Sequence, residues 1–282
     1  MSATLAKSGH FDPIHAAHAI EQVVFVIQFD STLDEAQLSE VRKVAMQFKS
    51  DKDLPGQMEV QEFSIAFSPP GSEPPEPPPL VPPGLVLQSI GRDGTVENDL
   101  RVERATLTFR TALYSRWDSA WAQARRYFES IVPAYTQYSR IRAISLNYVD
   151  KFVWAGDVAE CNPSLLISTH SRYVCPHVFE TREFWHSHTG KFIRTDDYTK
   201  RLLNVNIDYL EEASVVDTRR VVSITTVVTD MLNQPGYSSV GVTKEDSLDF
   251  VEKRMQNLHA FGKDILGDII STEMSKRIAL IG

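Results

Sequence analysis

The sequence predicts an α+β protein with two similar halves, each running strand, helix, three strands and helix, with antiparallel sheets covered by helices. Two observations support this fold class. Predicted strands cluster between helices and do not alternate with them one for one, which favours antiparallel pairing. The order of elements in residues 19–138 also recurs in residues 139–282, although no residue-level repeat is visible.

The chain has 282 residues, of which 42% are hydrophobic, enough to bury one large core or two modest ones. We expect residues 1–18 to be a flexible N-terminus, because they are small and polar. The first half then spans residues 19–138 with a proline-rich loop at 68–84, and the second half spans 139–282 and ends in a long helix.

In the first half, β-branched and aromatic residues predict a strand at 22–30, and alternation predicts another at 58–67. Asp34 can cap the helix between them. Two further strands are expected at 85–90 and 95–110, the second broken near Glu103. One face of the following helix is apolar, which predicts core packing. Its members are Trp117, Trp121, Ala124, Phe128 and Ile131.

The loop at 68–84 contains nine of the 15 prolines of the chain and should adopt extended polyproline II structure. Its PxxP spacing would suit a groove of SH3 type. Such spacing is common by chance, so a stiff connection between two strands is the favoured interpretation.

The second half opens with residues 140–154, RIRAISLNYVDKFVW, which carry apolar residues on both faces and predict a strand in the interior of a sheet. Strands are also expected at 173–188, with a bend near Pro176, at 201–210 and at 219–229. A closing helix should run from residue 244 to about 281, with a kink or break at Gly262 and Gly267.

A histidine-rich segment at 170–188 gathers four of the eight histidines and raises the hypothesis of a metal-dependent hydrolase or nuclease. Imidazole and carboxylate groups suit zinc or another divalent metal. The candidate ligands are His177, His186, His188 and, from a neighbouring strand, Asp208. The spacing matches no standard zinc signature, so an exposed polar face without a cofactor is favoured.

Arginines concentrate in the middle of the chain and raise a second alternative, binding of nucleic acid or phosphate. The candidates are Arg104, Arg110, Arg125, Arg126 and Arg142. Acidic residues are interleaved with them, which favours ordinary ion pairs. The net charge of −8 also disfavours nucleic acid as a partner.

No signal peptide and no apolar run of about 18 residues is visible, so no membrane association is expected. Two cysteines are too few for a disulfide framework and suit a reducing compartment, so we expect a cytoplasmic protein. P-loop, dinucleotide-binding and GxSxG motifs are all lacking.

Four segments in this order resemble a sporadically distributed family of uncharacterised prokaryotic proteins of about 250–280 residues. They are HAIEQVVFVIQF, SRWDSAWAQARRYFESIVP, RIRAISLNYVDKF and LDFVEKRMQNLHAFGKDILGDIISTEM. His259 and Phe261 match the family's histidine and aromatic pair in the last helix, whereas Ala19 replaces its usual proline. The resemblance implies a prokaryotic origin and an accessory or defence-associated role, and brings no established activity.

Taken together, these features predict a non-enzymatic protein-binding or assembly protein whose partner is another protein or a second copy of the chain, as in a homodimer. The lack of catalytic motifs supports this hypothesis, as does a long apolar closing helix with more apolar surface than one domain can cover.

Overall fold

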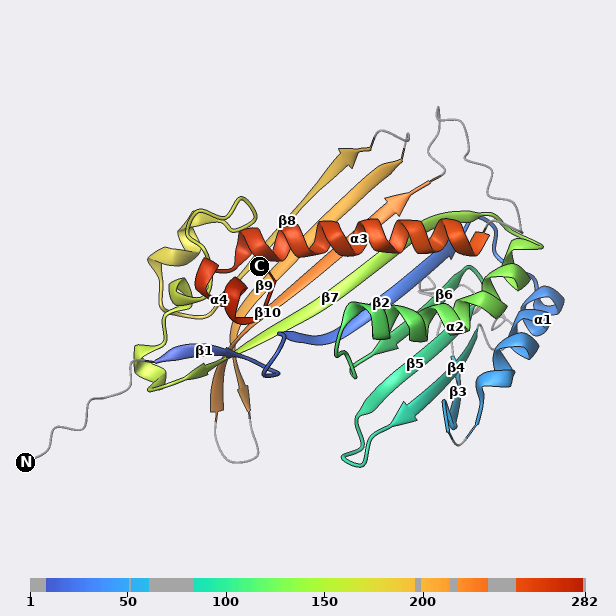
Figure 1. The fold of residues 1–282 in the computed structure, drawn as a ribbon, viewed down its shortest axis with the longest axis horizontal. Coiled ribbons are helices and arrows are strands. Elements are labelled where there is room, and N and C mark those ends of the chain that lie inside the picture. Colours follow the sequence, from blue (N-terminus) through green and yellow to red (C-terminus); the bar gives the residue numbers. More distant parts are fainter. Residues whose placement is uncertain are drawn as a thin grey trace, which may run out of the picture.

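The structure, a computed structural model, describes residues 9–50, 52–60, 84–195, 199–213, 218–232 and 247–280. Ten strands in these ranges form one antiparallel sheet, with helices packed on it (Figure 1). The strands are β1 (His10–Pro13), β2 (Ile20–Phe29), β3 (Gly56–Val60), β4 (Gly84–Ile90), β5 (Val96–Glu103), β6 (Thr106–Thr111), β7 (Ile141–Ala155), β8 (Trp185–Arg194), β9 (Lys200–Ala213) and β10 (Thr218–Met231). The helices are α1 (Glu35–Ala45), α2 (Trp117–Thr136), α3 (Ser247–Ile269) and α4 (Thr272–Arg277), with short 3₁₀ turns η1 (Met46–Phe48), η2 (Val158–Glu160), η3 (Pro163–Leu165) and η4 (Pro176–Glu180).

The predicted fold class of two halves with their own helix-covered sheets is wrong. The chain is dominated by a single sheet with the order β3-β4-β5-β6-β2-β7-β10-β9-β8, and β1 adds to β7. The cause is the pairing of β2 with β7, from Ile20 opposite Asp150 to Phe29 opposite Ile141. The backbone hydrogen bonds therefore continue from the first half of the sequence into the second.

β7 is the longest strand and lies in the middle of the sheet, with β2 on one side and β10 on the other. The predicted interior strand at 140–154 is thus confirmed. From Ile144 to Trp154, side chains at even positions of β7, such as Leu146 and Phe152, are buried beneath the helices. Those at odd positions from Asn147 to Ala155, such as Lys151, lie on the opposite face and are half-buried.

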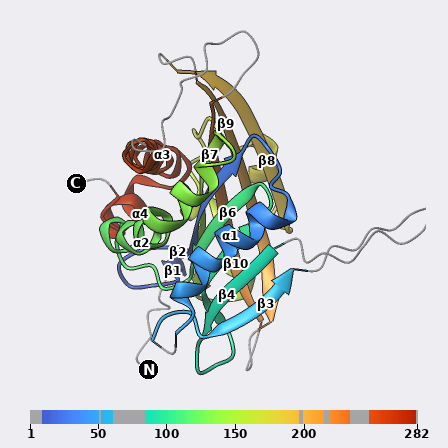
Figure 2. The same cartoon turned by 90° about the vertical axis from the view of Figure 1, so that its right-hand side faces the viewer.

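Helices α2 and α3 run across one face of the sheet, and α1 lies beside α2 (Figures 1 and 2). The apolar stripe of α2 is buried as predicted, from Trp117 to Ile131. α3 continues through Gly262 and Gly267 and ends at Ile269, so the predicted closing helix is interrupted just after the glycines, before α4, and does not run unbroken to about residue 281. Apolar residues on both sides of these glycines pack on the core, and this burial outweighs the low helix propensity of glycine.

The apolar face of α3 is covered by the chain itself. Val251, Met255, Leu258, Ile265 and Ile269 are all at most 2% exposed. The predicted surplus of apolar surface on the closing helix is therefore not found over the described length of α3. The residues predicted to begin this helix, 244–246, lie outside the described residues.

Local proline chemistry changes one predicted strand. Residues 173–188 do not form one strand: the 3₁₀ turn η4 begins at Pro176, and β8 starts only at Trp185. Proline presets its φ angle for such a turn and has no N–H group to donate to a sheet. Residues 61–67 of another predicted strand, and most of the proline-rich loop, lie outside the described residues.

The predicted break near Glu103 is confirmed, because β5 ends there and β6 starts at Thr106.

Over the described ranges, no helix is both long enough and apolar enough to span a bilayer.

Candidate functional site

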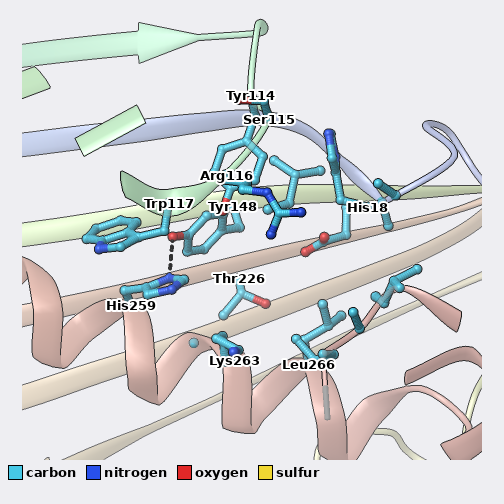
Figure 3. Close-up of a pocket in the computed structure, with 18 of the residues that line it drawn as sticks. His18, Tyr114, Ser115, Arg116, Trp117, Tyr148, Thr226, His259, Lys263 and Leu266 are labelled. Atoms are coloured by element: carbon cyan, nitrogen blue, oxygen red, sulfur yellow. Dashed lines mark hydrogen bonds between the residues drawn. The ribbon is translucent and has the colours of Figure 1, made fainter. Parts of the chain in front are cut away.

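A cavity of about 480 Å³ lies between α3 and the middle of the sheet, and we call it the α3 pocket (Figure 3). Its floor comes from β7 and β10, and one wall comes from α3. The loop between β6 and α2 borders it, as do the start of β2 and the end of α4. The volume lies within the range of about 300–1,000 Å³ that is usual for small-molecule sites.

The floor of the pocket is polar where the surrounding face of the sheet is apolar. Tyr148 and Asp150 point to the helix face of β7, and Thr226 of β10 pairs in register with Tyr148. Alternation along each strand fixes this direction. Asp150 and Thr226 are each only 2% exposed, among buried neighbours such as Ile224 and Phe152.

Two floor atoms lack a hydrogen-bond partner among the described residues. They are Oδ1 of Asp150 and Oγ1 of Thr226, which we call the acceptor floor. Leaving a buried polar atom unpaired costs about 1–3 kcal/mol, so such atoms are rare in folded proteins. Burial also raises the pKa of Asp150 from its usual 3.8 to about 7, because the carboxylate loses its hydration.

Tyr148, His259 and Trp117 form an aromatic wall beside the acceptor floor. The Tyr148 hydroxyl lies 2.8 Å from Nδ1 of His259, and the imidazole stacks on Trp117 with ring centroids 4.1 Å apart (Figure 3). Nε1 of Trp117 donates to Oε1 of Gln256 at 2.9 Å. This network fixes the three rings, because each is held by a contact from a different element.

Burial, followed by the nearby charge of Lys263, lowers the pKa of His259 to about 4. Burial raises the pKa of Tyr148 well above 10. Both groups are therefore uncharged at neutral pH, and the pair can orient a ligand by hydrogen bonding without adding charge to the wall.

Positive charge gathers at the rim of the pocket. Arg116 reaches over it from the β6–α2 loop, and Lys263 approaches from α3 (Figure 3). Both residues are exposed, and neither forms an ion pair with a described residue. Asp118, in the first turn of α2, is the acidic residue at the same rim.

The predicted metal ligands lie elsewhere and are not all brought together. His186 and His188 of β8 and Asp208 of β9 share the sheet face opposite to the helices, and Nδ1 of His186 is 3.8 Å from Oδ1 of Asp208. His177 lies on η4, not on the strand. In the described ranges, no group of three or more His, Cys, Asp or Glu side chains is arranged to hold a metal.

The predicted phosphate-binding arginines are dispersed and mostly paired. Arg104 donates to the carbonyl of Leu33, and Arg110 is held by Asp99 on the helix-free face. Arg125 pairs with Glu252 and Arg126 with Asp53. Arg142 is exposed on β7. They do not form a continuous basic surface.

The sequence interpretation missed the residues of the α3 pocket. One signal was present in β7: Tyr148 and Asp150 interrupt an otherwise apolar set of alternate positions from Ile144 to Trp154. A second signal was His259, which belongs to the pair that carried the family resemblance. Neither signal shows by itself that the two segments meet.

Comparison of the sequence with protein-family models finds no match, and comparison with curated proteins finds none either. The α3 pocket must therefore be interpreted from its own geometry.

Proposed function

We propose that this protein binds a small polar molecule in the α3 pocket. One observation carries the proposal: Asp150 and Thr226 line the floor of a cavity large enough for a metabolite, and each has a buried polar atom, Oδ1 and Oγ1 respectively, without a partner among the described residues. A ligand that donates hydrogen bonds to these atoms would remove the free-energy penalty of leaving them unpaired.

Gly262 adds support from the helix side of the pocket. Glycine inside a helix is about 1 kcal/mol less favourable than alanine. A Cβ atom at this position would meet only the Tyr148 ring, at 3.6 and 3.7 Å, so packing does not exclude a side chain. The missing side chain leaves space in the pocket, as a ligand would require.

Native mass spectrometry can test the proposal with untagged protein and a library of amino acids, sugars, sugar phosphates, nucleosides and nucleotides. Gly262→Leu fills the pocket. Gly267→Leu is the matched control, because Gly267 lies on the same helix but does not line the cavity. We expect a bound mass on the wild type and the control, and its loss in Gly262→Leu.

Two results would contradict the proposal. One is that no library compound binds the wild type. The other is that every compound that binds does so equally well to Gly262→Leu, which would place binding outside the α3 pocket.

Catalysis is a second candidate, and the pKa of Asp150 favours it. A carboxyl group that titrates near 7 can accept or give up a proton at neutral pH, as a general acid or base must. Analysis of the compound released from the protein separates the two functions. A chemically unchanged compound supports binding alone, and a converted compound supports catalysis.

The earlier hypotheses stay predictions: a protein partner or homodimer, a metal-dependent hydrolase, and nucleic-acid binding.

We propose the cytoplasm as the compartment, because Cys161 and Cys175 are free thiols.

A further inference from the structure

The two ends of the α3 pocket differ in chemistry, and this difference restricts the ligand. The acceptor floor offers oxygen atoms to a hydrogen-bond donor. The rim offers the cations Arg116 and Lys263. A ligand that satisfies both ends must be bipolar, with a donor group at one end and an anionic group at the other.

The N-terminus of α2 adds to the positive potential at the rim. α2 has 20 residues, and no side chain caps its first turn. Ser115, Arg116, Trp117 and Asp118 at this end all line the pocket. The free N–H groups and the dipole of such a helix favour an anion. With Arg116 and Lys263 they form what we call the anion subsite.

The acceptor floor points to a ligand independently of the helix end. Asp150 and Thr226 are each 2% exposed, both line the same cavity, and each has one buried polar atom without a partner among the described residues. Asp118 opposes an anion at the rim. Two cations and the helix end outweigh its single charge, and Asp118 is exposed to water, which screens it.

We propose that the ligand is a small phosphate monoester whose phosphate binds at the anion subsite and whose hydroxyl or amino groups donate to the acceptor floor. This inference rests on the proposed function. A phosphate suits the subsite better than a carboxylate, because it carries more charge and more acceptor oxygens for the guanidinium, the ammonium and the helix N–H groups.

Isothermal titration calorimetry can test the inference with four ribonucleoside monophosphates and ribose 5-phosphate, each compared with its unphosphorylated counterpart. These probes combine a phosphate with hydroxyl or amino donors. We expect at least one phosphorylated probe to bind at least 10-fold more tightly than its counterpart, and its affinity to fall as the salt concentration rises.

Variants at the rim and at the floor of the pocket test which end of the ligand binds at each. Arg116→Ala with Lys263→Ala should weaken the phosphorylated probe by at least 10-fold and leave its counterpart within 2-fold. Arg125→Ala removes a charge from α2 outside the pocket and is the control. Asp150→Asn should weaken both compounds, because the amide replaces one of the two acceptor oxygens of the carboxylate by an N–H₂ donor.

The outcomes separate this inference from the proposed function. The phosphate inference is overturned if counterparts bind as tightly as phosphorylated probes, or if the double variant behaves like Arg125→Ala. It is also overturned if the only library compounds whose binding is lost in Gly262→Leu are unphosphorylated. In that case the proposed function, binding of a small polar molecule, stands. If no library compound loses its binding in Gly262→Leu, the phosphate inference and the proposed function both fail.

Discussion

At the scale of single residues, Asp150 is an ionisable side chain whose burial disfavours its charged form. Its carboxyl group is almost fully buried on the floor of the α3 pocket, and one oxygen has no partner among the described residues. The raised pKa means that the folded state holds a proton that the unfolded chain releases above about pH 4. Folding is therefore coupled to pH through this one residue.

We predict that Asp150→Asn removes part of the pH dependence of stability. Because the pKa is raised, the contribution of Asp150 is complete below about pH 4 and is lost as the pH rises through 7. The variant should match the wild type near pH 4 and exceed its free energy of unfolding by roughly 4 kcal/mol near pH 8. Urea unfolding at both pH values measures this.

His259 provides an internal control for that experiment. Its lowered pKa acts in the opposite direction, so its contribution is complete above about pH 6.5 and falls as the pH drops through 4. Both proteins carry His259, so the difference between them isolates Asp150. Equal pH dependence in the two proteins would show that Asp150 is ionised and compensated in the folded state.

Gly262 and Gly267 offer a second test at the residue scale. We predict that Gly262→Ala and Gly267→Ala each raise the free energy of unfolding by about 0.5–1 kcal/mol, because alanine favours the helix and each Cβ finds only contacts at 3.6–3.7 Å. Chemical unfolding checks this. A loss of stability in Gly262→Ala alone would mean that packing against Tyr148, not ligand space, requires the glycine.

At the scale of elements, a buried ion cluster attaches α3 to the sheet. Asp230 of β10 is fully buried and accepts hydrogen bonds from Arg201 of β9 at 2.7 and 3.0 Å. Arg254 of α3 lies 3.4 Å from the same carboxylate. The cluster thus fixes the position of the helix that forms one wall of the α3 pocket.

We predict that Asp230→Asn lowers the free energy of unfolding by about 3–5 kcal/mol, because it removes the buried negative charge that the guanidinium groups of Arg201 and Arg254 both contact. Arg125→Ala, which breaks the more exposed pair between α2 and α3, should cost less than about 1 kcal/mol. Urea unfolding of both variants compares the pairs. Similar losses would show that the cluster contributes no more than a surface ion pair.

At the scale of the whole molecule, the pairing of β2 with β7 joins the two halves of the sequence into one hydrogen-bonded sheet. Trp117 from the first half stacks on His259 from the second, so side-chain packing crosses the same boundary. The α3 pocket lies at this junction, because its lining comes from elements of both halves.

We predict that the two halves unfold in one transition. Native-state hydrogen exchange with increasing urea should give the most protected amides of β5 and β10 the same free energy of opening, because neither half can lose its sheet without exposing the edge of β2 or β7. A separate, lower value for one half would show that β2 and β7 can part while the rest stays folded.

The sequence by itself determined the elements whose patterns are local. Alternation identified β7 as an interior strand, helical spacing identified the buried face of α2, and the break near Glu103 marked the turn between β5 and β6. These features depend on neighbouring residues only, so periodicity is enough to predict them.

The tertiary structure alone decided the single sheet and the site. The pairing of β2 with β7 joins strands more than 100 residues apart, and local periodicity carries no information on such partners. The same holds for the α3 pocket. Alternation predicts the face of β7 on which Asp150 lies, but the burial that raises the pKa of Asp150 depends on tertiary packing against that face. The candidate histidines show that residues close in sequence need not share an element, because His177 lies on η4 and His186 on β8.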